Sequence, residues 1–251
     1  MLEIKNIYKT FNPGTINEKV ALNGLSLKLN EGDFVTVIGG NGAGKSTMLN
    51  AVAGVWPVDE GQIIIDGTDV TKLSEYKRAA YLGRVFQDPM TGTAATMGIE
   101  ENLALAKRRG KTRFLRSGIT KAEREEYKEL LKILNLGLED RLTSKVGLLS
   151  GGQRQALTLL MATLQKPKLL LLDEHTAALD PKTAAKVLDI TDRIVNRDHL
   201  TTLMITIDTS LDGILSARVS KLMTTDSPIQ SGEVTILTLS DALFSIITQL
   251  T

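Results

Sequence analysis

The stretch "DFVTVIGGNGAGKSTMLNAVAG", Asp33 to Gly54, joins a predicted strand, a glycine-rich loop and a predicted helix. The segment "FVTVIG" is a nearly continuous apolar run that ends in glycine, which is typical of a buried strand. The segment "KSTMLNAVA" is predicted to be a helix, and Gly54 stands where a helix commonly stops. Strand, loop and helix in this order favour an α/β fold.

The loop between them, Gly39 to Thr47, matches the pattern G-x-x-x-x-G-K-[S/T] of phosphate-binding loops. Glycines leave backbone N–H groups free to surround a phosphate, and a helix N-terminus adds partial positive charge. We expect Lys45 to reach the β- and γ-phosphates and Ser46 to ligate Mg²⁺. The residues expected to contact nucleotide are Gly39, Asn41, Gly42, Ala43, Gly44, Lys45, Ser46 and Thr47. The alternative is a glycine-rich turn that only happens to precede a lysine.

The rest of the chain alternates between predicted strands and helices. Strands are expected at 25–29, in a hairpin that turns at Asp66-Gly67, in "KLLLLD" and in "LTTLMIT". Helices are expected at 99–107, at 120–135, from Gly151, and from Pro181 to about Asn196. This alternation predicts a mostly parallel sheet with right-handed crossovers.

Two carboxylates, Asp173 and Glu174, follow the apolar run "LLLL". Beside a phosphate loop, the first can enter a magnesium sphere and the second can activate a water molecule. We therefore expect Asp173 to be a metal ligand and Glu174 to be a general base. The ending alone is weak evidence, because many strands end in a polar loop.

The segment "LSGGQ", Leu149 to Gln153, precedes another predicted helix. Ser150 and Gln153 have the spacing of a capping box, which would explain the serine without any function. A cap does not need two glycines, however, and bare backbone suits the approach of a phosphate to a helix N-terminus. Both interpretations stay open from the residues alone.

With these motifs the chain resembles the nucleotide-binding subunits of ATP-binding cassette (ABC) transporters along nearly its full length. The resemblance is carried by the phosphate loop, "VFQDP", "LSGGQ", "LLLLDE" and "AALD". It implies an α/β fold: a P-loop NTPase core with a mostly parallel sheet, an N-terminal antiparallel β subdomain and an inserted α-helical subdomain. It also implies one domain over 1–251, with a core of 1–88 and 167–251 and a helical subdomain of about 89–166.

The same resemblance implies ATP and Mg²⁺ as cofactors and assigns further residues. Phe11 would stack on adenine, with Tyr8 as the alternative aromatic residue and core packing as the alternative role of Phe11. Gln87 would contact the magnesium ion or the attacking water and act in catalysis with Lys45 and Glu174. Two subunits would sandwich two ATP molecules, and the residues that serve the partner's nucleotide would be Ser150, Gly151, Gly152, Gln153 and Asp180.

The implied activity is ATP hydrolysis that energises a transporter, and "GTAATM" to "ENLALAKRRG" and "DEHTAALDPKTA" look like importer subunits for amino-acid uptake. Expected partners are a second nucleotide-binding subunit, in a homodimer or heterodimer, integral membrane permease subunits docked on the helical insert, and a secreted substrate-binding protein. Nucleic acid is not expected. The alternatives are a soluble ABC-type ATPase and a nucleotide-dependent regulatory subunit with low turnover.

One position departs from the family pattern. Ile207 follows the strand "LTTLMIT", where the family carries a histidine that contacts the γ-phosphate. His199 lies in a polar connection and is expected to be exposed. His175 is expected to shape the turn after Glu174, with a compensating catalytic role as the alternative. We therefore expect ordinary ATP binding with hydrolysis slowed by about 10²–10⁴-fold, in a C-terminal stretch that diverges as a whole.

The overall composition is that of an ordinary globular chain, with 251 residues, 42% apolar residues and a net charge of +1. The absence of cysteine excludes a disulfide framework and a thiolate metal site. No apolar run approaches the roughly 20 residues that cross a bilayer, and the N-terminus lacks a signal-peptide core. We expect a cytoplasmic protein, bound peripherally to the inner face of the cell membrane through its permease.

Seven cations and no acid occur between Lys107 and Lys121, and without them the formal charge would be −6. The simplest interpretation is a solvated loop between helices. A patch that faces anionic lipid headgroups or an acidic partner loop is the alternative.

Overall fold

The computed structural model describes residues 1–39, 41–110, 118–206, 221–225 and 235–237. Ile207, most of the divergent C-terminal stretch and residues 111–117 of the basic segment lie outside the described residues. Among the described residues, no helix has both the length and the apolar character needed to cross a membrane.

The larger sheet has six strands in its described part, in the order β10-β9-β3-β8-β7-β6. Four neighbouring pairs are parallel, and only β9 and β10 pair in antiparallel fashion. The strands are β3 (Phe34–Gly39), β6 (Leu82–Val85), β7 (Leu169–Asp173), β8 (Thr201–Thr206), β9 (Lys221–Thr225) and β10 (Thr235–Leu237). The prediction of a mostly parallel sheet is confirmed.

A second, antiparallel sheet has the order β2-β1-β4-β5 and contains the N-terminus. Its strands are β1 (Leu2–Phe11), β2 (Lys19–Leu29), β4 (Glu60–Ile65) and β5 (Thr68–Asp69). The hairpin between β4 and β5 turns at Asp66 and Gly67, with φ of 51° and 76°. Positive φ at both positions is what the favoured two-residue hairpin turn requires, so the predicted hairpin is confirmed. Strand β2 begins six residues before the predicted 25–29.

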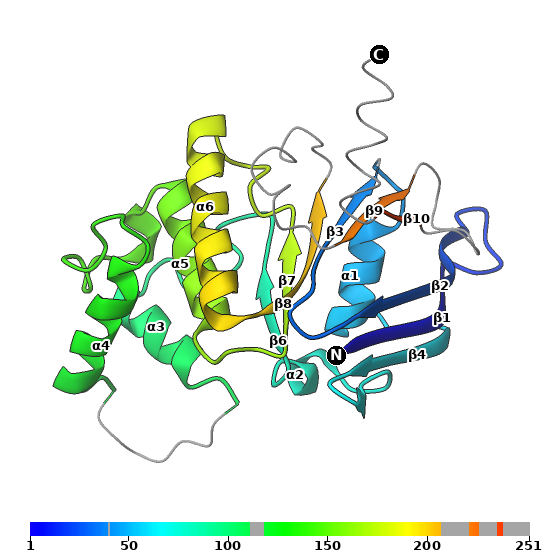
Figure 1. Ribbon diagram of the computed structural model, residues 1–251, viewed down its shortest axis with the longest axis horizontal. Coiled ribbons are helices and arrows are strands. Elements are labelled where there is room, and N and C mark those ends of the chain that lie inside the picture. The colour runs from blue at the N-terminus through cyan, green and yellow to red at the C-terminus, as the bar shows by residue number, and fades with distance from the viewer. Residues whose placement is uncertain (40, 111–117, 207–220, 226–234, 238–251) are drawn as a thin grey trace.

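The helices cover the parallel sheet on both faces (Figure 1). They are α1 (Lys45–Ala53), α2 (Glu75–Arg78), α3 (Ile99–Lys107), α4 (Lys121–Lys132), α5 (Gly151–Thr163) and α6 (Pro181–Asp198), with a 3₁₀ turn η1 (Val146–Leu148). Helix α1 lies between the two sheets, whereas α3 to α6 gather on the opposite side (Figure 1). The predicted helix 120–135 ends earlier, at Lys132, and α6 extends two residues beyond the predicted Asn196.

The alternating leucines of β7 contribute to two separate cores. Leu169 and Leu171 pack with α1 and the antiparallel sheet, whereas Leu170 and Leu172 pack with the helical segment and α6. All four are fully buried. This two-sided burial is what the continuous apolar run predicts for a central parallel strand. It also fixes the end of β7, where the two carboxylates follow.

The first cations of the basic segment are paired with acids of α4. Lys107 forms an ion pair with Glu126, and Arg108 Nη2 lies 2.8 Å from Glu123 Oε1. Burial lowers the pKa of Arg109. Lys107 and Arg108 are thus paired within the chain, and neither the solvated loop nor the patch is tested for residues 111–117, which lie outside the described part.

Candidate functional site

The phosphate loop turns sharply from β3 into α1. Gly44 is the N-cap of α1 with φ of 86°, a left-handed conformation that glycine adopts without strain. A Cβ atom at Gly44 would lie 2.5 Å from the backbone oxygen of Ala21. Glycine at this position is therefore required both by the backbone conformation and by the neighbouring strand β2.

A pocket of about 310 Å³, called the loop pocket below, opens over this turn. Its lining residues are Phe11, Lys19, Ala21, Asn41, Gly42, Ala43, Gly44, Lys45, Ser46, Thr47, Trp56 and Glu174. It brings most of the predicted loop residues together with Phe11 and Glu174, which are distant in sequence. Gly39 ends β3 and is not among the described lining residues. Neither is Tyr8, the alternative aromatic residue.

Two aromatic residues line the loop pocket. The rings of Phe11 and Trp56 meet edge to face, and the ammonium of Lys9 lies 5.7 Å from the Phe11 centroid. Sequence reasoning missed Trp56. Its one signal was that the chain's only tryptophan follows closely after a predicted phosphate-loop helix.

Glu174 turns into the pocket from the end of β7. Its φ is 43°, unusual for a residue with a side chain, and its N–H donates to the backbone oxygen of Ile205 on β8 at 3.0 Å. The bond to the neighbouring strand holds the turn in place. A carboxylate fixed here can accept a proton from a water molecule in the pocket.

Asp173 is held on the sheet rather than in the loop pocket. Its Oδ2 lies 3.2 Å from Nη2 of Arg84 on β6, and the same nitrogen donates to Asn50 Oδ1 at 2.8 Å. Arg84 was not singled out from the sequence. Gln87 follows β6 with an exposed side chain, and among the described residues neither Gln87 nor Asp173 lines the loop pocket.

The two histidines occupy different environments. His175 is buried, and its Nε2 lies 3.1 Å from Thr191 Oγ1 on α6. Burial lowers the pKa of His175 to about 4, so the ring is neutral at pH 7 and anchors the turn after Glu174, as expected. His199 is exposed at the end of α6, which confirms that expectation.

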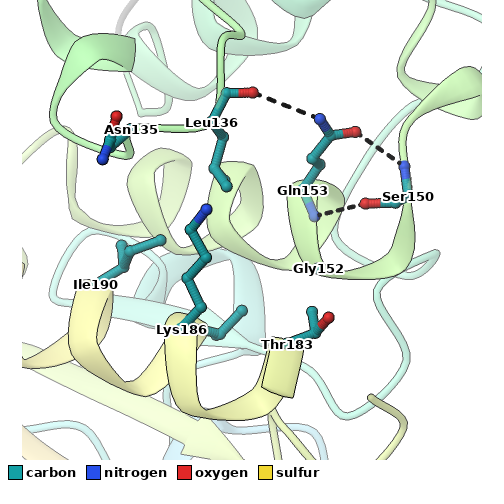
Figure 2. A pocket seen from close by; sticks show the side chains of 9 residues that line it. Asn135, Leu136, Ser150, Gly152, Gln153, Thr183, Lys186 and Ile190 are labelled. Carbon is teal, nitrogen blue, oxygen red and sulfur yellow. Dashed lines mark hydrogen bonds between the residues drawn. The ribbon is translucent and has the colours of Figure 1, made fainter. Parts of the chain in front are cut away.

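The "LSGGQ" segment opens α5 with the predicted capping box. The N–H of Gln153 donates to Ser150 Oγ at 3.3 Å, and the N–H of Ser150 donates to Gln153 Oε1 at 3.1 Å. Gln153 Nε2 also donates to the backbone oxygen of Leu136 at 3.5 Å. Figure 2 shows these bonds at the edge of a second pocket of about 480 Å³, called the helix pocket below.

The helix pocket lies between α5, α6 and the segment before Gly137. Lys186 reaches from α6 across it toward Leu136 and Gln153 (Figure 2). Ser150, Gly152 and Gln153 line this pocket and not the loop pocket. Within the described residues of one chain, the "LSGGQ" segment and the phosphate loop therefore line two different pockets.

The glycines of this segment also have a packing role that the sequence did not indicate. A Cβ atom at Gly152 would lie 2.1 Å from Cγ2 of Thr183, and one at Gly151 would lie 3.2 Å from Leu179 Cδ2. Close packing of α5 against the start of α6 thus leaves no room for a side chain at Gly152 unless Thr183 shifts. Asp180 is the N-cap of α6, where its Oδ1 accepts from the N–H of Thr183 at 3.1 Å. Hydrogen bonds from Thr183 lower the pKa of Asp180.

Comparison with known proteins identifies the family. Residues 22–177 match the family of ABC transporters. The chain is 47% identical over 211 residues to the tyrosine transport ATP-binding protein of Clostridioides difficile, covering 82% of each chain. It is 38% identical over 190 residues to the methionine import ATP-binding protein MetN of Rhizobium etli, covering 74% of this chain and 50% of that one.

A solved structure has the same fold. The dimeric ATP-binding cassette MJ0796, in a post-hydrolysis state bound to ADP and phosphate, superposes with a TM-score of 0.77 at 28% identity. The match covers 95% of this chain and 99% of that one. The phosphate-loop turn, the carboxylates that end β7 and these likenesses agree: the chain belongs to the ABC transporter family, and it is an ATP-binding cassette ATPase.

Proposed function

We propose that the chain binds ATP in the loop pocket and energises an importer of a small solute. The observation that carries the proposal is the composition of that pocket, which combines the phosphate loop, two aromatic residues and the Glu174 carboxylate. The backbone N–H groups of the loop would surround the β-phosphate, and Lys45 would balance the charge of the β- and γ-phosphates. Phe11 would take the adenine ring by stacking.

The residues present suit Mg²⁺ as the second cofactor. Magnesium prefers oxygen ligands and is usually held by one or two carboxylates together with substrate phosphates. Ser46 is exposed in the phosphate loop, and only the Oδ2 atom of Asp173 is engaged by Arg84. We assign Ser46, Asp173 and Gln87 to the metal. Bound there, Mg²⁺ would neutralise charge on the phosphate oxygens, while Glu174 would accept the proton of the attacking water.

The separation of the two pockets favours a site shared by two chains. Ser150, Gly151, Gly152 and Gln153 would serve the nucleotide of a second cassette, and the capped N-terminus of α5 would present its N–H groups to the γ-phosphate. Asp180, at the start of α6, would lie near the same junction. The likeness to a dimeric cassette supports this arrangement.

Turnover is proposed to be slow because Ile207 cannot offer the polar contact of a histidine to the γ-phosphate. His175 is an unsuitable substitute, since it is buried and bonded to α6 and is not among the described residues that line the loop pocket. In a heterodimer, the "LSGGQ" segment of this chain would complete a competent site on the other cassette.

The named relatives suggest the class of solute and partners. One is a tyrosine transport protein and another a methionine import protein, so we propose an amino acid or similar small solute. Specificity would reside in permease subunits and a secreted binding protein, with this chain docked on the cytoplasmic side of the membrane. We also propose that residues 1–88 and 167–251 form the nucleotide-binding core and that residues from about 89 to 166 form the helical subdomain.

The test is co-expression with a candidate permease, followed by affinity purification and a single-turnover ATPase assay. Co-purification and hydrolysis that Glu174→Gln abolishes would support the proposal. Hydrolysis without any membrane partner would favour a soluble ATPase, and ATP binding without detectable turnover would favour a regulatory subunit.

A further inference from the structure

Arg84 connects three elements around the proposed metal carboxylate. It lies on β6 beside Leu171 of β7, with a side chain that is 14% exposed, and Asp173 is 16% exposed. The guanidinium lies 4.6 Å from the Phe86 ring centroid. Through Asn50 it also contacts α1, the helix that follows the phosphate loop.

The contact of Arg84 with Asp173 is the longer of its two side-chain hydrogen bonds. Both bonds come from the single nitrogen Nη2, at 2.8 Å to Asn50 and 3.2 Å to Asp173. Nε is buried and makes no hydrogen bond within the described residues. A two-nitrogen fork, the strong form of an arginine–carboxylate pair, is therefore not used. If Asp173 turned to another cation, Arg84 would keep Asn50 and the Phe86 ring.

A poorly solvated carboxylate needs a counter-ion both before and after nucleotide binds. A charge that is largely removed from water is costly unless it is paired. We propose that Arg84 is a positioning residue that neutralises Asp173 before nucleotide binds and releases it when Mg²⁺ arrives with ATP. The inference rests on the proposed function, because it takes Asp173 as a metal ligand.

The exchange makes Arg84 a competitor of the metal. Without the guanidinium, the carboxylate would have lost its internal counter-ion, so Mg²⁺ would increase the affinity for nucleotide by a larger factor. Without the Asn50 side chain, Asp173 would be the remaining described acceptor of Arg84 Nη2. The guanidinium would then compete more strongly for the carboxylate, and Mg²⁺ would increase the affinity for nucleotide by a smaller factor. The two changes therefore act in opposite directions, which loss of packing alone does not produce.

The test measures binding of a non-hydrolysable ATP analogue by calorimetry, once in EDTA and once in saturating Mg²⁺. The readout is the ratio of the two dissociation constants, EDTA over Mg²⁺. We expect a ratio above one in the parent chain, a ratio raised on the order of threefold to tenfold in Arg84→Met, and a lowered ratio in Asn50→Ala. Arg84→Lys keeps the charge and should stay near the parent.

Arg108→Met is the matched control, because Arg108 forms a similarly buried ion pair with Glu123 far from the carboxylate. It should leave the ratio unchanged. A parent ratio of one would overturn the assignment of the metal site itself. A parent ratio above one with no rise in Arg84→Met, or with Arg84→Met and Asn50→Ala shifting it in the same direction, would overturn the role of Arg84 alone. If Arg84→Met does not fold, the ratio in Asn50→Ala decides: a lowered ratio supports the role of Arg84, and an unchanged or raised ratio overturns it.

Discussion

The ring centroids of Phe11 and Trp56, which both line the loop pocket, lie 5.0 Å apart with their planes at 82°, in an edge-to-face contact. This geometry is a favoured one for aromatic pairs. It braces Phe11, whose ring is proposed to take the nucleobase, against a residue that follows α1. The only tryptophan of the chain is thereby placed as a natural reporter of the pocket.

The first prediction is that ATP changes the intrinsic fluorescence of Trp56. Phe11→Ala should weaken ATP binding on the order of tenfold, because stacking of a base on an aromatic ring contributes about 1–3 kcal/mol. Trp56→Phe should abolish the optical signal while keeping most of the affinity. Titration with ATP checks both. An unaltered emission spectrum at saturating ATP would argue against a base beside these two rings.

The second prediction concerns acid and His175. The pKa of His175 is about 4 in the folded chain, against an ordinary value near 6.5. Below pH 6.5 the unfolded chain therefore binds a proton that the folded chain does not, and stability falls as the pH drops from about 6.5 to about 4. The loss should reach about 3 kcal/mol at most.

Denaturant unfolding across this pH range gives the measurement. His175→Gln should flatten the slope of unfolding free energy against pH, whereas His199→Gln, at the exposed histidine, should leave it as in the parent. Equal slopes in the parent and in His175→Gln would contradict the assignment of the effect to the buried ring.

The third prediction is that Ile207→His raises ATP turnover at least tenfold, since it restores a polar group of the kind that contributes about 10²–10⁴-fold in general acid–base catalysis. Position 207 lies outside the described residues, so the expectation rests on sequence. Steady-state ATPase assays measure it, and adding Glu174→Gln should remove the gain. A rise of less than a few-fold would count against impaired hydrolysis.

The fourth prediction concerns the packing of Gly152 against Thr183. Gly152→Ala should destabilise the fold by about 1–3 kcal/mol, because the new methyl group collides with Cγ2 of Thr183. Thr183→Ser removes that atom and should recover much of the loss in the double variant. Gly118→Ala is the control, since a Cβ there meets nothing within 4 Å. Chemical denaturation of the parent, the two single variants, the double variant and the Gly118→Ala control tests the coupling.

The sequence was informative where local chemistry determines structure. The apolar run of β7, the Asp66-Gly67 turn and the Ser150–Gln153 cap each follow from short-range rules, and the structure has all three. The phosphate loop was predictable for the same reason, because the backbone conformation of a single short turn requires its glycines.

Contacts between distant segments could not be predicted in this way. Arg78 has the composition of a surface residue, yet it is 2% exposed and donates to four backbone oxygens, those of Ala51, Val52, Thr71 and Leu73. Trp56 acquires its role only when β1 brings Phe11 against it, and Arg84 acquires its role only when α1, β6 and β7 come together. No local pattern encodes a partner that is tens of residues away.

The most direct test of the account is isothermal calorimetry of the full chain with ATP and Mg²⁺, beside the Lys45→Ala variant. We predict saturable binding of one nucleotide per chain, weakened about tenfold to a hundredfold in Lys45→Ala, since hydrogen bonds to charged groups contribute about 1.5–3 kcal/mol. Absence of any binding heat in the parent at several temperatures, or equal affinity in both proteins, would contradict the claim that this loop holds a triphosphate.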